Sequence, residues 1–185
     1  MPCVQYAFGL FDGSECVGVV TYGLPPNFAE CEAWKPWPVL ELNRLCVDCD
    51  RENASSTLVG RSLARLKQLH HGVIISYADM SIGHVGYIYQ ATNWTYTGIG
   101  GSGHPVYKMV DGSIKHPRHE RTIPENEIAS IEKSDGKHRY YFFAGNKHEQ
   151  YTMRASLRFK VFPYPKGKTK RYDADHAIDI QKTLF

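Results

Sequence analysis

The sequence predicts an α/β (α+β) domain built on a central, twisted, mixed sheet with few flanking helices. Three observations support this. Short runs rich in β-branched and aromatic residues recur along the 185-residue chain, one long helical stripe lies near its middle, and the order strand–helix–strand surrounds that stripe. Hydrophobic residues make up 42% and charged residues 22%, which permits a packed core and excludes wholesale disorder. We expect a single domain over residues 1–185.

The first half of the sheet begins with a hairpin. Residues 4–11 and 15–22 have strand character, and Asp12-Gly13-Ser14 between them is typical of a turn. Residues 25–38 are rich in proline and are expected to form a loop. A third strand is predicted over Leu40–Val47.

The middle of the chain predicts a parallel crossover. Val59, Leu63, Leu66 and Leu69 form an apolar stripe, so a helix is expected from Ser55 to about His70. The short apolar run 73–78 is typical of a buried strand, and the connection between the two strands should be right-handed. A second helix is expected over 83–92, and further strands over 94–98, 139–144 and 156–162.

Two segments are expected to lie outside this core. Residues 98–137 are a predicted insertion, which begins with a glycine-rich hinge or lid at Gly98–Gly103. Residues 166–185 are a predicted tail, basic at first and then acidic.

Charge is unevenly distributed. Residues 1–50 carry a net charge of −5, because they hold seven acidic and two basic residues, whereas residues 51–185 carry +8. Seven basic residues and no acid lie between Arg154 and Arg171. This pattern indicates a polyanion partner, although a solvated basic surface would give the same pattern. The candidate DNA-binding residues are Arg158, Lys160, Lys166, Lys168, Lys170 and Arg171.

Composition also bears on location and metals. No stretch approaches 18 apolar residues, so no membrane partner is expected. Five cysteines without a regular framework favour reduced thiols in a cytoplasm, the host's if the chain is phage-encoded. The lone pair Cys46 and Cys49 and the run 116–119 lack zinc-ligand spacing, so no metal is predicted.

Two charged residues are candidates for chemistry. Asp79 ends a buried strand, where loss of solvation would raise its pKa and suit it to accept a proton; a turn or helix cap is the alternative. Arg44 interrupts an apolar strand and could clamp an anion, or could pair with Asp79 or Glu41.

The two helices offer further candidates. Ser55, Ser56 and Thr57 begin the first helix, where exposed amides attract phosphate, although such residues are also ordinary caps. His84 could shuttle protons, and Tyr87 or Tyr89 could hold a leaving group; packed aromatic residues are the alternative.

Several motifs together resemble the phage Mom DNA-modification family. They are Tyr6–Gly9, Gly18–Gly23, Glu41–Leu45, Ser76–Asp79, Gly83–Trp94, Lys137–Tyr140 and Pro163–Gly167. This resemblance implies a GNAT-like fold that lacks its N-terminal strand and helices. It also implies transfer of a methylcarbamoyl (acetamido) group to the exocyclic amine of adenine in double-stranded DNA, which protects the DNA from host restriction.

The resemblance further implies a site. Phosphates of acetyl-CoA or a related acyl donor would lie at the amides of Ser55–Leu58, and Arg44, Asp79 and Tyr89, with His84, would form the catalytic centre. The adenine would be flipped out and stacked on aromatic side chains, for which Trp34, Trp37 and Tyr107 are candidates.

Two other functions fit the sequence. One is a GNAT-fold N-acyltransferase that acts on a small amine or a protein. The other is a non-enzymatic nucleic-acid binder, for which the basic run would matter and Asp79 would not. A homodimer is compatible with each function.

Overall fold

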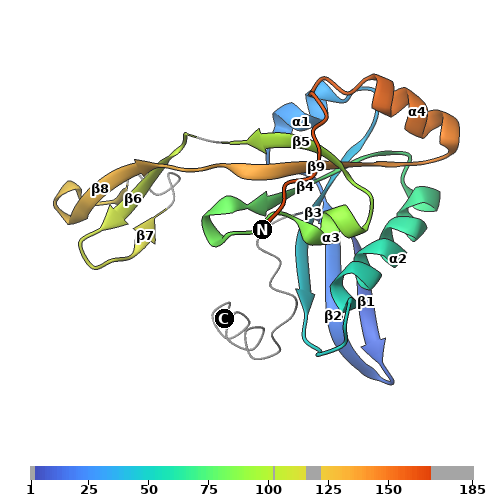
Figure 1. Ribbon diagram of the computed structural model, residues 1–185, viewed down its shortest axis with the longest axis horizontal. Helices are drawn as coiled ribbons and strands as arrows, with labels where there is room; N and C mark the ends of the chain where they lie inside the picture. The colour runs from blue at the N-terminus through green and yellow to red at the C-terminus, as the bar shows by residue number, and fades with distance from the viewer. Residues whose placement is uncertain (1–2, 102, 116–121, 168–185) are drawn as a thin grey trace.

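A computed structural model of the chain describes residues 3–101, 103–115 and 122–167. Its main sheet has six strands in the order β1-β2-β3-β4-β9-β5. A second sheet has the order β7-β6-β8 and forms an arm that projects from the main body (Figure 1). The mixed sheet with few helices is therefore confirmed.

The predicted hairpin is present. β1 (Val4–Asp12) and β2 (Glu15–Gly23) pair antiparallel, with Asp12 opposite Glu15, so the loop holds two residues. Gly13 takes a φ of 60°, which suits the tight turn.

The loop predicted over 25–38 is wrong in its middle, because a short helix, α1 (Phe28–Ala33), lies there. The Asn27 side chain caps it by accepting a hydrogen bond from the Ala29 amide at 3.2 Å. Six residues flanked by prolines carry too little helical periodicity to be recognised.

The parallel crossover is present as predicted. β3 (Val39–Val47) leads through α2 (Ala54–Leu69) to β4 (Gly72–Asp79), and β3 and β4 are parallel. After β4, the predicted helix 83–92 is shorter than expected. A 3₁₀ turn, η1 (Met80–Ile82), precedes α3 (Tyr87–Ala91), since Gly83 and Gly86 take positive φ values that interrupt a helix.

β5 (Thr95–Gly100) and β9 (Lys137–Ala144) complete the main sheet as an antiparallel pair. The predicted glycine hinge is wrong at Gly98 and Gly100, because both belong to β5. Between these strands lie the arm elements β6 (Pro105–Met109), β7 (Ile114–Lys115), η3 (Glu125–Glu127) and β8 (Ile128–Lys133).

The strand predicted over 156–162 is also wrong. A helix, α4 (Lys147–Ala155), follows β9, and residues 156–167 then run without pairing into a sheet. The sequence signal for α4 is the pair Asn146 and Glu149, which form a capping box.

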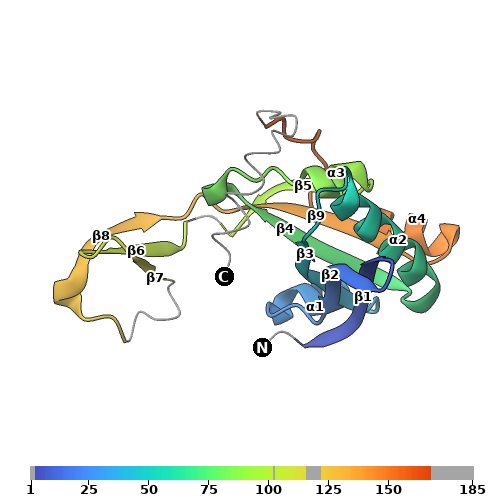
Figure 2. The ribbon, with the colours of Figure 1, turned by 90° about the horizontal axis from the view of Figure 1, so that it is seen from below.

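The two faces of the sheet are covered by different helices (Figures 1 and 2). α2 packs Leu58, Leu63 and Leu66 against one face, which α3 extends with Ile88 and Tyr89. The other face packs against α1 and α4 through Trp34 and Met153.

Candidate active site

The main sheet opens between its two parallel strands. β3 and β4 pair only from Val39 to Glu41 and from Val73 to Ile75. Beyond that point β3 stays with β2 as far as Val47, and β4 stays with β9 as far as Asp79. The two strands therefore diverge beyond this point, and this opening corresponds to the switch point of an open α/β sheet.

Glu41 is the last residue of β3 that pairs with β4, and it is half-buried. Leu40 and Leu42 belong to the core beneath α2, so Glu41 faces the side of α1. Burial raises the pKa of its carboxyl, Lys137 opposes the rise, and Glu30 adds to it. A half-buried carboxyl with a raised pKa is suited to accept a proton.

Ser76 and Tyr89 lie on the other side of the opening. The Ser76 hydroxyl is 2.8 Å from the Tyr89 hydroxyl and 3.2 Å from the Leu42 carbonyl oxygen. The Leu42 carbonyl thus meets a side chain where a paired strand would supply an amide. Burial raises the pKa of Tyr89, and the charge of Glu41 adds to that rise. Tyr89 is therefore a protonated hydroxyl within electrostatic range of Glu41.

Asp79 differs from the expectation of a raised pKa. Burial does act to raise the pKa, but hydrogen bonds from the Ser81 hydroxyl (2.6 Å) and amide (3.0 Å) and the ammonium of Lys137 (3.3 Å) hold it below its ordinary value. Asp79 is the N-cap of η1, as the alternative interpretation proposed.

Arg44 and His84 are exposed. Arg44 is exposed rather than buried in β3, where a β-bulge lies between the Thr21 and Tyr22 pairs. Its charge acts on Glu41, whose pKa it lowers against the rise caused by burial. Its guanidinium contacts the Asn43 carbonyl at 3.0 Å. His84 lies in the loop before α3, and its amide donates to the Asp79 carbonyl at 3.1 Å.

The start of α2 has the features of a helix end that attracts anions. Its N-cap, Asn53, makes no side-chain capping bond, and no acid lies in the first turn. Ser56 and Thr57 line a groove of about 340 Å³ between α2 and α3, together with Lys67. Ser55 is half-buried, whereas the Leu58 side chain is in the core, so only backbone groups of Leu58 could contact a ligand.

The basic and aromatic candidates differ in how exposed they are. Arg158, Lys160 and Lys166 are exposed, whereas Lys168, Lys170 and Arg171 lie outside the described residues. Trp34 and Tyr107 cannot stack a base as predicted, because they are 5% and 4% exposed. Trp37 is half-buried against the core beneath α1.

Within the described ranges, no group of three or more His, Cys, Asp or Glu side chains could hold a metal ion. The run 116–119 lies outside those ranges. In the same ranges, no helix is both long and apolar enough to cross a membrane.

The class of fold follows from the order of the elements. A hairpin, a strand, a crossover helix to a parallel strand and a final antiparallel pair are the GNAT-like arrangement that the sequence implied. The chain also matches the model of the Mom protein family over residues 1–166. It therefore belongs to that family.

The chain is similar to individual proteins as well. It is 28% identical over 175 residues to the methylcarbamoylase mom of Escherichia phage Mu. This match covers 85% of this chain and 70% of the phage Mu protein. Among solved structures, an N-acetyltransferase from Staphylococcus aureus Mu50 is 14% identical, with a TM-score of 0.45, over 74% of this chain and 66% of that one. A Bacillus subtilis acetyltransferase in complex with CoA is 14% identical, with a TM-score of 0.44, over 74% of this chain and 75% of that one. The ribosomal-protein-S18-alanine N-acetyltransferase from Escherichia coli is 9% identical, with a TM-score of 0.41, over 74% of this chain and 65% of that one.

Proposed function

We propose that this chain modifies DNA by placing a methylcarbamoyl group on the exocyclic amine of adenine. The observation that carries the proposal is membership of the Mom protein family over residues 1–166, with a methylcarbamoylase of phage Mu as a relative. The enzyme would act in the cytoplasm of the phage's host and protect the DNA from restriction.

The amine of adenine is a weak nucleophile, because its lone pair is delocalised into the ring. When the new N–C bond forms, the amine must lose a proton, and Glu41 is our candidate acceptor. Its raised pKa and its place at the opening of the sheet support this role. Tyr89, held by Ser76, would donate a proton or hydrogen bond on the other side. The product carbon carries a carboxamide, which plain acyl transfer does not supply, so these roles concern the amine alone.

Three of the four catalytic residues predicted from sequence keep proposed roles at the rim of the opening. Asp79 is ionised and paired with Lys137, so it would orient groups rather than accept the proton. Arg44 and His84 are exposed beside the opening and would contact DNA.

The start of α2 fits the phosphates of acetyl-CoA or a related acyl donor. The first turn has no acid and no side-chain cap, and a groove with Ser56, Thr57 and Lys67 adjoins it. Ser55 and the backbone of Leu58 belong to the same turn.

Double-stranded DNA is the proposed partner. The adenine amine is paired in the duplex, so the base must be flipped out at a cost of a few kcal/mol. Arg158, Lys160 and Lys166 are exposed and would contact phosphates, together with Lys168, Lys170 and Arg171. Binding should therefore weaken steeply with added salt.

Nucleoside mass spectrometry of plasmid DNA from expressing bacteria tests the proposal. We expect modified deoxyadenosine with the wild type and at least 100-fold less of it with Glu41→Gln. Glu32→Gln should give as much as the wild type, because Glu32 is an exposed glutamate paired with Lys35. Unmodified DNA from the wild type, with acylation of a small amine or a protein instead, would overturn it.

A further inference from the structure

Residues 156–167, here called the strap, run from α4 across the edge strand of the main sheet (Figure 1). Phe159 stacks on Tyr141 on the α4 side, with ring centroids 6.0 Å apart. The Phe162 amide then donates to the Tyr96 carbonyl at 3.1 Å, and the Tyr164 hydroxyl donates to the Trp94 carbonyl at 2.6 Å. The strap is therefore anchored on both faces of the sheet and fixed over β5.

A cavity of about 450 Å³ lies between the strap and β5. This volume is within the range of sites for small organic ligands. Its aromatic lining includes Tyr96, Phe162 and Tyr164, and Arg154 contributes the charge. Among the residues that the structure describes, no carboxylate lines it.

The aromatic walls are open to a ligand. Phe162 is 42% exposed and Tyr164 is 40% exposed, and their rings lie against Tyr96 and Tyr140, which belong to the same core cluster. Val161, also in the lining, is 56% exposed. Flat apolar faces of this kind stack a nucleobase without regard to its sequence.

Arg154 adds recognition of an anion. One of its nitrogens donates to the Thr95 hydroxyl at 3.0 Å, which fixes the guanidinium at the cavity and leaves other donors. Its charge also lowers the pKa of Tyr164, against a larger rise caused by burial. Residues 150–167 contain no acid, and Arg158 and Lys160 are exposed on the same segment. The surroundings of the cavity are thus complementary to phosphate.

We propose that this cavity binds one unstacked nucleotide of the DNA, with its base against Phe162 and Tyr164 and its phosphate at Arg154. The proposal rests on the proposed function, since it takes DNA as the partner. β5 lies two strands from β4, or about 10 Å, which corresponds to about three nucleotides along a stacked strand. The bound nucleotide would therefore be close to the reacting adenine and would help to hold the strand during flipping.

The test uses the full chain, without any acyl donor, and a short single-stranded oligonucleotide that carries one 2-aminopurine. Stacking of that base quenches its fluorescence, and anisotropy of a second dye gives Kd. Val161→Glu places an acid in the cavity from an exposed position, and Arg154→Gln removes the cation. We expect each variant to raise Kd about tenfold and to weaken the quenching.

Arg65→Gln is the matched control, because Arg65 is an exposed arginine on α2 whose guanidinium donates to the Gln68 side chain. It should bind as the wild type does, and Arg154→Lys should recover part of the affinity. Wild-type affinity and quenching in both cavity variants would overturn the proposal. It would also be overturned if CoA displaced the oligonucleotide equally well from wild type and Arg65→Gln but failed to displace it from Val161→Glu, since CoA would then occupy the cavity. These readouts do not depend on whether the DNA is modified, so failure of the proposed reaction would be seen separately by mass spectrometry.

Discussion

Glu41 makes a prediction about stability as well as chemistry. Its pKa is raised in the folded chain, so the folded state binds its proton more tightly than the unfolded state does. The ionised carboxylate therefore costs stability as pH rises from the ordinary value of 4.5 through the raised value. We expect Glu41→Gln to raise the melting temperature at pH 8 relative to wild type, and the difference to shrink near pH 4.

Differential scanning calorimetry at both pH values checks this expectation, with Glu32→Gln as the control. Glu32 is exposed and paired with Lys35, so its replacement should give no gain at pH 8. If Glu41→Gln melts below the wild type at pH 8, the ionised carboxylate does not cost stability, and Glu41 instead belongs to a stabilising ion pair.

The pKa of Asp79 is shifted in the opposite direction to that of Glu41. Its pKa is lowered, so its contribution to stability is present above the ordinary value of 3.8 and is lost as pH falls through the lowered one. We expect Asp79→Ala to lower the free energy of unfolding at pH 7 by about 1 kcal/mol, because the η1 cap is lost. Asp79→Asn keeps an acceptor for the Ser81 amide and should lose less, as measured by urea unfolding. Equal losses in both variants would show that the Lys137 pair, and not the cap, dominates.

The sequence predicted Asp79 from its place at the end of a buried strand and Tyr89 from its place in the second helix, and the two residues lie in β4 and α3. It could not predict the pKa of Asp79, since Lys137 comes from β9 and is distant in sequence. Glu41 was missed as a base for a similar reason. A glutamate inside a strand has no sequence signature of burial, and its half-buried state depends on where β3 and β4 stop pairing.

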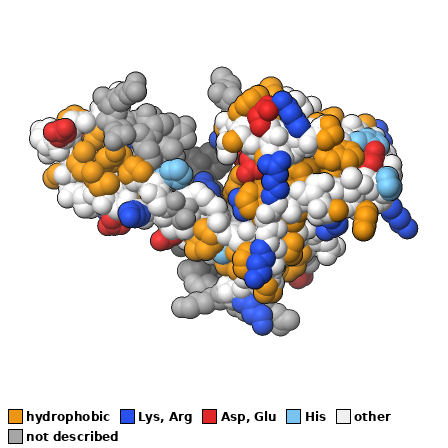
Figure 3. All heavy atoms as spheres, turned by 90° about the horizontal axis from the view of Figure 1, so that it is seen from above, with side chains coloured by type: hydrophobic (Ala, Val, Ile, Leu, Met, Phe, Trp, Pro, Cys, Tyr) orange, Lys and Arg blue, Asp and Glu red, His pale blue; other side chains and the backbone are white. Residues whose placement is uncertain are grey.

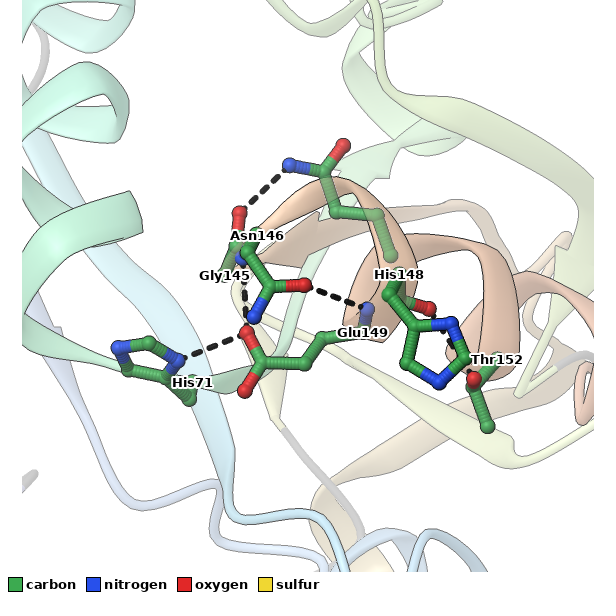
Figure 4. Close-up of polar contacts among 7 residues, drawn as sticks. His71, Gly145, Asn146, His148, Glu149 and Thr152 are labelled. Atoms are coloured by element: carbon green, nitrogen blue, oxygen red, sulfur yellow. Dashed lines mark hydrogen bonds and ion pairs between the residues drawn. The ribbon is translucent and has the colours of Figure 1, made fainter.

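The start of α4 is stabilised by a network of polar contacts (Figure 4). The Glu149 amide donates to the Asn146 side chain at 3.0 Å, and the Asn146 amide donates to the Glu149 carboxylate at 2.7 Å. The same carboxylate lies 2.8 Å from His71 Nδ1, just before β4. The network therefore ties the helix that carries Arg154 to the main sheet.

Removal of this cap should loosen α4. We expect Asn146→Ala to cost about 1 kcal/mol and to lower the melting temperature by about 2–4 °C. Asn146→Ser keeps a capping oxygen and should recover most of the loss, measured by circular dichroism. The pKa of Glu149 is lowered, chiefly by the backbone amide of residue 146, which Asn146→Ala keeps, so the difference between the two proteins should change little as pH falls through that lowered value. A difference that disappears over that pH range would contradict this.

Elements were predictable where periodicity was long. The stripe of α2 and the turn of the β1–β2 hairpin were sufficient, because local pattern and packing agree there. The strand predicted over 156–162 was wrong, although Leu157, Phe159 and Val161 give the alternating apolar pattern that is typical of a strand. Phe159 and Phe162 instead anchor an unpaired segment on Tyr141 and Tyr96.

At the scale of the molecule, the arm differs from the body in its charge. Lys and Arg side chains are spread over the body, whereas hydrophobic side chains lie on both the body and the arm (Figure 3). Residues 102–135 contain five basic and six acidic residues, so the arm adds no net positive charge. Val110, Ile114 and Ile131 are each at least 60% exposed on it. The arm is therefore unsuited to phosphate contacts, and DNA affinity should reside in the body.

The body should also fold without the arm. Gly100 pairs with Lys137 at the end of the β5–β9 ladder, and the flanking Gly101 and Gly136 take φ values of 67° and 89°. Deletion of residues 102–135 would join these two glycines into a two-residue turn with positive φ at both positions, which suits the twist of an antiparallel hairpin. We expect the shortened chain to unfold cooperatively, with a melting temperature close to that of the full chain, and to bind duplex DNA with an unchanged salt dependence. Replacement of the joined pair by Val-Val is the matched control and should destabilise the hairpin, because β-branched residues disfavour positive φ. If the deletion with the glycine pair unfolds without cooperativity, or loses DNA binding while it remains folded, then the arm is part of the core or of the DNA interface.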